Sequence, residues 1–307
     1  MQAIFKNRWL PFLLLLPTLI ILVLFLYYPI LNTFQLSLYK AAPNGLDLTY
    51  VGLDNFAKLL DPNIVTDEKT GVVQVKGEYF IVLARSLAFS GAIVFGGLAL
   101  SLGLAMLANQ KVKGIRFYRT LLIWPYAISP AIAGVVFLFM FNPVGVVNYA
   151  VNSVFHVRPN WLGDPVLTPI LVIVASIWKN LGYNVIFYLA GLQNVAGDLL
   201  EAASIDGANR WQRFWRIIFP LLSPFTFFLL ITNLTYSFFD IFGTVDVLAG
   251  PGPRNSTTVL IYNLYQDLQV NHSTGMAAAQ SVLLFILVAG ITIVQFRSGE
   301  RRVTYGA

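Results

Sequence analysis

Six long apolar stretches divide this chain, and they limit its possible folds more than any other feature. They cover Trp9–Leu31, Phe80–Ala108, Thr120–Phe141, Thr168–Leu192, Pro220–Phe242 and Ala277–Phe296. A helix needs about 20 apolar residues to cross the hydrocarbon core of a bilayer, and each stretch is long enough to do so. The sequence therefore predicts an all-α membrane protein with about six transmembrane helices.

The composition agrees with lipid as the main solvent of this chain. Only 11% of the residues are charged and 57% are hydrophobic, whereas about a quarter of a soluble domain is charged. The absence of cysteine excludes disulfides, zinc-thiolate sites and thiol catalysis. The two histidines, His156 and His272, are far apart and have no partner at metal-ligand spacing, so no metal site is expected.

Basic residues gather in short segments that all fall on one side of the six stretches. Those segments hold Lys6 and Arg8, then Lys111, Lys113, Arg116 and Arg119, then Arg210, Arg213 and Arg216, and finally Arg297, Arg301 and Arg302. Excess Lys and Arg marks cytoplasmic loops, so we expect both termini of a multi-pass bacterial inner-membrane protein to be cytoplasmic. The same rule explains the net charge of +6 without nucleic acid. The segment 32–79 is then a periplasmic insertion, whose part from Val65 to Val75 is typical of a hairpin or a loose insertion.

The most informative loop spans residues 193–219, between the fourth and fifth stretches. Asp198 is placed to cap a short helix, and Gly207 to end it in a left-handed conformation. A second, amphipathic helix then leads to Pro220. Glu201 and Asp206 offer carboxylates to a basic partner, and the small residues beside them permit close approach. An ordinary amphipathic connector that rests on lipid is the plainer interpretation of this loop.

The spacing of this loop resembles the signature of binding-protein-dependent ABC importer permeases. It reads Glu201-Ala202-Ala203, three residues, Gly207, nine residues, Ile217, one residue, then Phe219 before Pro220. Phe219 stands where the family usually has Leu, which is a conservative apolar change. Similar likenesses cover nearly the whole chain, at Val51–Phe56, Leu122–Pro130, Ile177–Asn184 and Ala277–Ser281. Within the maltose-transporter permease family, the chain looks most like the first permease subunit of glycerol-3-phosphate importers.

The resemblance implies a type I ABC importer permease fold in one transmembrane domain of residues 1–307. It also implies a cytoplasmic coupling helix that seats in an ATPase subunit, with Glu201, Ala202, Ala203, Asp206, Gly207 and Arg210 as the coupling residues. The expected partners are two ATPase subunits that bind ATP and Mg, a second permease subunit and a periplasmic solute-binding protein. The chain holds no Walker A sequence, so it is not expected to be an enzyme or to hold a cofactor itself.

Polar side chains inside the fourth and fifth stretches are candidates for the solute pathway, because polar groups within spans are costly. The candidates are Tyr183, Asn184, Asn233, Tyr236, Ser237 and Asp240. Hydrogen bonding between helices would explain them without any solute. We expect Lys179 to snorkel or to pair rather than to bind a phosphate.

The solute stays open at this stage among a sugar, a polyol glycoside and a glycerol phosphate. No Arg lies near mid-membrane, which slightly favours a neutral hydroxylated solute, although Lys179 or a cation in the partner permease could reverse this. The alternative of an ion-gradient-driven secondary transporter predicts inverted repeats and ion-coupling carboxylates, and the sequence shows neither. A membrane-embedded enzyme would need a catalytic cluster inside the spans, which the sequence also lacks.

Overall fold

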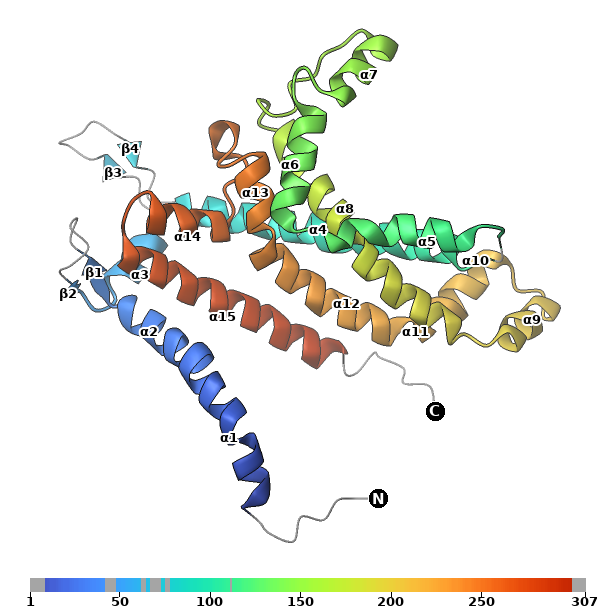
Figure 1. Ribbon diagram of the computed structural model, residues 1–307, viewed down its shortest axis with the longest axis horizontal. Helices are drawn as coiled ribbons and strands as arrows, with labels where there is room; N and C mark the ends of the chain where they lie inside the picture. Colours follow the sequence, from blue (N-terminus) through green and yellow to red (C-terminus); the bar gives the residue numbers. More distant parts are fainter. Residues whose placement is uncertain are drawn as a thin grey trace. The chain divides into compact units, whose positions relative to one another are not determined.

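The computed structural model describes residues 9–41, 48–61, 65–66, 73–74, 78–110 and 112–299 (Figure 1). The described elements are mostly helices, with two short antiparallel hairpins. The chain divides into two compact units, Met1–Tyr79 with Leu264–Phe285 and Phe80–Asn263 with Ile286–Ala307. The predicted topogenic residues Lys6, Arg8, Lys111, Arg301 and Arg302 lie outside the described residues, as does much of the 32–79 insertion.

The first unit begins with a long helical segment made of three elements. It consists of α1 (Leu10–Leu22), the π-helix η1 (Val23–Tyr27) and α2 (Tyr28–Leu36). The apolar span runs from Phe12 to Leu36, so the helix extends a few residues beyond the predicted Leu31. Its large apolar side chains are exposed, and no described residue of η1 or α2 is buried. The described residues of this unit therefore leave the apolar surface of its first helix uncovered.

A small polar structure follows α2 in the same unit. Strand β1 (Tyr39–Ala41) pairs with β2 (Leu48–Tyr50), and helix α3 (Asp54–Leu60) comes next. The buried Asn55 amide donates to the carbonyl oxygens of Ser37 at 2.8 Å and Tyr39 at 3.0 Å. These bonds tie α3 to the end of α2. Strands β3 (Val65–Thr66) and β4 (Val73–Gln74) also pair, which agrees with the hairpin, one of the two forms expected for this part of the chain.

The second unit is built around three apolar helices. These are α4 (Glu78–Ala108), α8 (Leu167–Gln193) and α12 (Ser223–Thr235), which share a buried apolar cluster. Its largest fully buried side chains include Tyr188, Leu222 and Leu229. Helix α4 meets α8 at glycines: a Cβ added to Gly96 would lie 3.2 Å from Ile177 Cδ1.

The third predicted span is not one helix. The structure has α5 (Ile115–Ile123), the 3-10 helix η2 (Trp124–Ala127) and α6 (Pro130–Phe141) in its place. Pro130 disfavours helical geometry in the residue before it, and Ser129 is extended, with a ψ of 157°. The Ser129 hydroxyl then accepts from the Ile132 amide at 3.2 Å and caps α6. The prediction of a continuous helix over Thr120–Phe141 was therefore wrong.

Helix α5, which precedes the break, packs along α8, and α6, which follows it, packs along α8 and α13 (Phe242–Leu248) (Figure 1). The apolar path resumes at Pro130 and continues to Phe155 through α7 (Val146–Phe155).

Helix α7 buries a polar side chain and exposes apolar ones, which is the inverse of the usual distribution in a soluble protein. Its buried residue is Asn148, whose side chain donates to Asn142 O at 3.2 Å and accepts from Trp161 Nε1 at 3.0 Å. Its outward side chains include Val146, Tyr149 and Val154, which are 74%, 78% and 68% exposed. These positions follow helical spacing, so they form one apolar stripe that faces away from the unit.

The fifth span is bent. A first segment, Arg210–Leu221, comprises α10 (Arg210–Arg213), the π-helix η3 (Phe214–Ile218) and α11 (Phe219–Leu221). It meets the segment Ser223–Asp240, made of α12 and the π-helix η4 (Tyr236–Asp240), at 66°. Pro220 and Pro224 flank the bend, and proline is a common cause of helix kinks.

The remaining elements are η5 (Pro253–Asn255), α14 (Leu260–Gln269) and α15 (Thr274–Gly299). Within the described residues, five helices are long and apolar enough to span a membrane, and the bent pair would make six. The prediction of about six spans in an all-α membrane protein is confirmed.

Candidate functional site

The loop with the Glu-Ala-Ala triplet forms a short helix, α9 (Gly197–Ile205). Its N-cap is Ala196, without a side-chain hydrogen bond, so the prediction that Asp198 caps the helix was wrong. Asp198 lies in the first turn instead, where its charge favours the helix dipole.

Gly207 ends α9 as predicted. Its φ of 81° is in the left-handed region, where glycine has no Cβ penalty. The Ala208 amide donates back to Ala203 O at 2.9 Å. Asn209 and Gln212 then form a reciprocal capping box that starts α10 at Arg210.

Helix α9 has no buried residue, and its Ile205 side chain is 87% exposed. The Arg213 guanidinium donates to Leu200 O at 3.4 Å and ties the second helix to the first. All six predicted coupling residues lie in this one loop, where Ala203 is half-buried and the other five are exposed. The arrangement presents acidic and small residues on a helix that the described part of the chain leaves uncovered.

A polar cavity lies among the spans of the second unit. Its volume is about 200 Å³, and it is lined by Tyr126, Lys179, Asn180, Tyr183, Thr232, Tyr236 and Asp240. These side chains come from η2, α8, α12 and η4. Thr232, Tyr236 and Asp240 are four residues apart, so a helical segment places them on one side.

Lys179 is the cation of this cavity. Its side chain is 8% exposed. Its Nζ lies 5.0 Å from the ring centroid of Tyr126 and 5.2 Å from that of Tyr236. Among the described residues, no carboxylate oxygen comes within 4.0 Å of this ammonium. The cation therefore makes no salt bridge with the described residues and is buried against two aromatic faces, while the expectation that Lys179 snorkels stays a prediction.

Hydrogen bonds between helices hold the wall behind the cavity. The Asn233 amide donates to Asn184 Oδ1 at 2.7 Å and accepts from Asn184 at 3.1 Å and from Asn180 at 2.8 Å. Ser237 and Ser90 share a hydrogen bond of 2.6 Å between η4 and α4. The Tyr236 hydroxyl donates to Ser176 O at 3.3 Å, which fixes this ring against α8.

The six predicted pathway residues therefore divide into two groups. Tyr183, Tyr236 and Asp240 line the cavity. Asn184, Asn233 and Ser237 are buried and hydrogen-bonded to neighbouring helices, which is the alternative explanation given from the sequence. Sequence reasoning did not place four lining residues in the pathway: Tyr126, Lys179, Asn180 and Thr232. The signal for Asn180 and Lys179 was present, since both are polar and lie within one turn of Tyr183.

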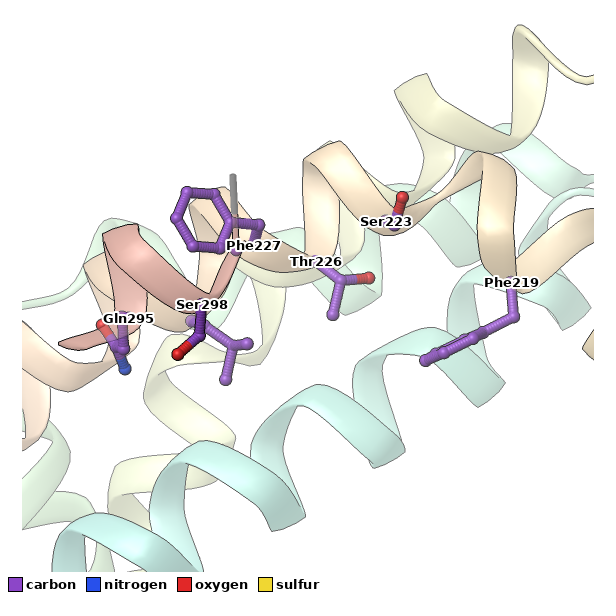
Figure 2. A pocket seen from close by; sticks show the side chains of 8 residues that line it. Phe219, Ser223, Thr226, Phe227, Gln295 and Ser298 are labelled. Atoms are coloured by element: carbon purple, nitrogen blue, oxygen red, sulfur yellow. The ribbon is translucent and has the colours of Figure 1, made fainter. Parts of the chain in front are cut away.

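A second cavity, of about 260 Å³, lies where α11 and α12 meet the end of α15 (Figure 2). Its lining is mostly apolar: Phe219, Ser223, Thr226, Phe227, Leu230, Gln295, Ser298 and Gly299. An apolar lining of this kind cannot replace the water lost by a hydroxylated solute. The polar cavity around Lys179 is therefore the better candidate for a solute site. Within the described residues, no group of three or more His, Asp or Glu could hold a metal ion.

Asp267 joins α14 to α15 in the first unit. It accepts from the Asn271 side chain at 2.8 Å and from the Gln280 side chain, while its own carbonyl accepts from the Ser273 amide at 2.8 Å. Burial raises the pKa of the Asp267 carboxyl above its usual 3.8, and the hydrogen bonds from Asn271 and Gln280 oppose this shift.

Residues 97–302 match the family model described as "Binding-protein-dependent transport system inner membrane component". Several curated relatives are similar over nearly their full length, and each is named "sn-glycerol-3-phosphate transport system permease protein UgpA". The relative from Rhizobium meliloti is 42% identical over 99% of both chains. That from Agrobacterium fabrum is 41% identical over 99% of both chains. That from Yersinia pestis is 39% identical over 98% of this chain and 97% of its own.

Two solved structures share the fold. One is a crystal structure of a bacterial ABC transporter involved in the import of the acidic polysaccharide alginate, with a TM-score of 0.81 and 24% identity over 97% of this chain and 98% of that chain. The other is the alginate ABC transporter in complex with an alginate pentasaccharide-bound periplasmic protein, with a TM-score of 0.82 and 24% identity over 98% of both chains.

Proposed function

Since this chain belongs to the family of binding-protein-dependent transport system inner membrane components, we propose that it imports sn-glycerol-3-phosphate or a close glycerol phosphate. It does so as one half of the pathway of an ATP-driven importer. The observation that carries the proposal is a sequence identity of 42%, over 99% of both chains, to a permease named for this solute. The chain is a multi-pass inner-membrane permease, and the family resemblance gives no role in catalysis to the permease itself.

The size and chemistry of the polar cavity support a small solute. Its volume of about 200 Å³ is below the roughly 300–1,000 Å³ of pockets for drug-sized ligands. Its lining offers hydroxyl, amide and carboxylate groups to a polyol and one ammonium to an anionic group. A glycerol phosphate carries both kinds of group.

Coupling to ATP is assigned to the loop of α9. We expect two ATPase subunits, which bind ATP and Mg, and one of them would receive this helix through Glu201, Ala202, Ala203, Asp206, Gly207 and Arg210. The absence of any buried residue in this helix supports the role, because a largely exposed helix with acidic and small residues suits a partner's groove. A second permease subunit would complete the pathway, and a periplasmic binding protein would deliver the solute. Both termini and this loop would then be cytoplasmic.

The test is a reconstitution of the chain with the subunits that copurify with it in mild detergent. Proteoliposomes that contain this complex and its binding protein should take up radiolabelled sn-glycerol-3-phosphate only when ATP is present inside them. A control complex without the ATPase subunits should show no uptake. If the isolated chain moves the solute in response to an ion gradient, without ATP, it is a secondary transporter and the proposal is wrong.

A further inference from the structure

The ammonium of Lys179 has donors that the described part of the chain does not use. A lysine ammonium carries three N–H donors, but the contacts of this one are with the faces of Tyr126 and Tyr236. Aromatic faces stabilise the charge through their quadrupoles and leave the N–H groups without an oxygen acceptor. Charged groups within a span are costly and mark functional sites, so the position of this cation requires a reason.

The geometry keeps this cation in place for a ligand. Tyr236 is fixed by its bond to Ser176 O, and Tyr126 lies against Tyr183 with ring centroids 5.2 Å apart. Because both rings are held by their own contacts, the ammonium between them has little freedom to leave the cavity. The cavity therefore holds a positioned positive charge before any solute enters.

The second charge of the cavity limits which ligands fit. Asp240 also lines it, but lies beyond the 4.0 Å of a salt bridge with Lys179. A carboxylate accepts hydrogen bonds from hydroxyl groups and repels anions. The best match is a small solute with an anionic group at one end and hydroxyl donors at the other.

We propose that Lys179 is the anion-recognition residue of this cavity, where its ammonium binds the phosphate of the solute while Asp240 accepts the solute's hydroxyl groups. Lysine is a common phosphate ligand that acts as a point charge. The inference rests on the proposed function for the identity of the solute, and it adds the residue that would make the permease select a charged polyol.

The test uses uptake of radiolabelled sn-glycerol-3-phosphate by the complete complex with its binding protein. Lys179→Met should lower uptake by about tenfold or more, which corresponds to the loss of one charge-assisted hydrogen bond. ATPase stimulation by the binding protein should change much less. Lys113→Met, which removes the charge of an exposed loop lysine, is the matched control and should keep normal uptake.

A chemical rescue separates charge from shape. The chain has no cysteine, so Lys179→Cys introduces its only thiol. A methanethiosulfonate that attaches an aminoethyl group should restore much of the uptake, whereas one that attaches a methyl group should not. The wild-type complex, which lacks the Lys179→Cys substitution, is treated with the same reagents and controls for thiols in partner subunits. If Lys179→Met fails to insert, this pair of reagents decides the question.

The possible results distinguish a failure of this inference from a failure of the proposed function. Normal uptake in Lys179→Met, or equal rescue by both reagents, would overturn it while leaving the proposed function intact. If the wild-type complex carries another solute instead, the proposed function is wrong, and the same variants are then measured with that solute. A loss confined to an anionic solute would uphold the role of Lys179, and no loss would overturn it.

Discussion

Asn184 and Asn233 exchange hydrogen bonds between their side-chain amides, at 2.7 and 3.1 Å, across the contact of α8 and α12. Both side chains are almost fully buried, and Asn180 adds a third amide to the same group. A mutual amide pair fixes the rotation of each helix, because either side chain alone would be left with unsatisfied polar atoms. The wall of the polar cavity therefore depends on this pair.

Asn233→Leu should destabilise the protein, since it leaves the amides of Asn184 and Asn180 without their partner. The expected loss is about 1 kcal/mol, in the range measured for hydrogen bonds between membrane helices. Thermal unfolding in detergent measures it. The double variant Asn184→Leu/Asn233→Leu should lose less than the sum of the two single variants, and strict additivity would show that the pair is not coupled.

Gly182→Ala should loosen the contact between α8 and the end of α5. A Cβ at this position would lie 2.6 Å from Ile123 O and 2.9 Å from Ile123 Cα. Backbone atoms cannot move aside as a flexible side chain can, so we expect a loss of about 1–3 kcal/mol. Gly103→Ala in α4, where a Cβ would meet nothing within 4 Å, is the matched control and should be neutral or slightly stabilising. Equal melting temperatures for the two variants would contradict the prediction.

Glu201→Lys should leave the permease inserted but weaken its association with the ATPase subunits and abolish uptake. The reason is the reversal of a charge on an exposed helix that we assign to ATPase coupling. Copurification of the ATPase and ATP-dependent uptake are the two measurements. Asn194→Lys adds a charge at another exposed position of the same loop and should be tolerated. An intact, active complex with Lys at position 201 would show that this carboxylate is not needed.

The contact of α14 with α15 should weaken as the pH rises through the acidic range. The folded pKa of Asp267 is raised by burial above its usual 3.8, so its contribution to stability is fully present below the unfolded pKa. That contribution is lost as the pH rises through the higher folded value. Hydrogen exchange of the segment 264–285, followed from about pH 4 upward, measures this. Asp267→Asn stays neutral, so this part of the pH dependence should disappear, and its persistence would assign the effect to another group.

The apolar runs and single glycines were enough to predict most of the architecture. Spans at α4, α8 and α15 follow from length and hydrophobicity alone. Gly207 was predictable because a left-handed residue after a helix is usually glycine. The break before Pro130 was hidden by the apolar residues around it, although the residue before a proline is restricted.

The cavity was less predictable because one face of the segment Ser223–Asp240 bonds to neighbouring helices, whereas the adjacent face lines the cavity. Asn233 and Ser237 lie four residues apart and bond to neighbouring helices, whereas Tyr236 and Asp240, also four apart, line the cavity. Their spacing in the sequence fits one helix face, so the pattern alone could not separate the two groups. Tyr126 comes from a 3-10 turn in another segment, and only the packing of that turn against α8 brings it to Lys179.

The exposed apolar side chains of α7 affect how this protein must be handled once it is extracted from a bilayer. Helix α7 ends the candidate span Pro130–Phe155, and its Val146, Tyr149 and Val154 face outward, so a surfactant belt too narrow to reach α7 would leave an apolar patch in contact with buffer. Protein molecules with an exposed apolar patch aggregate through it. A lipid nanodisc, or a detergent with a wide micelle, should therefore keep the protein monodisperse better than a minimal belt.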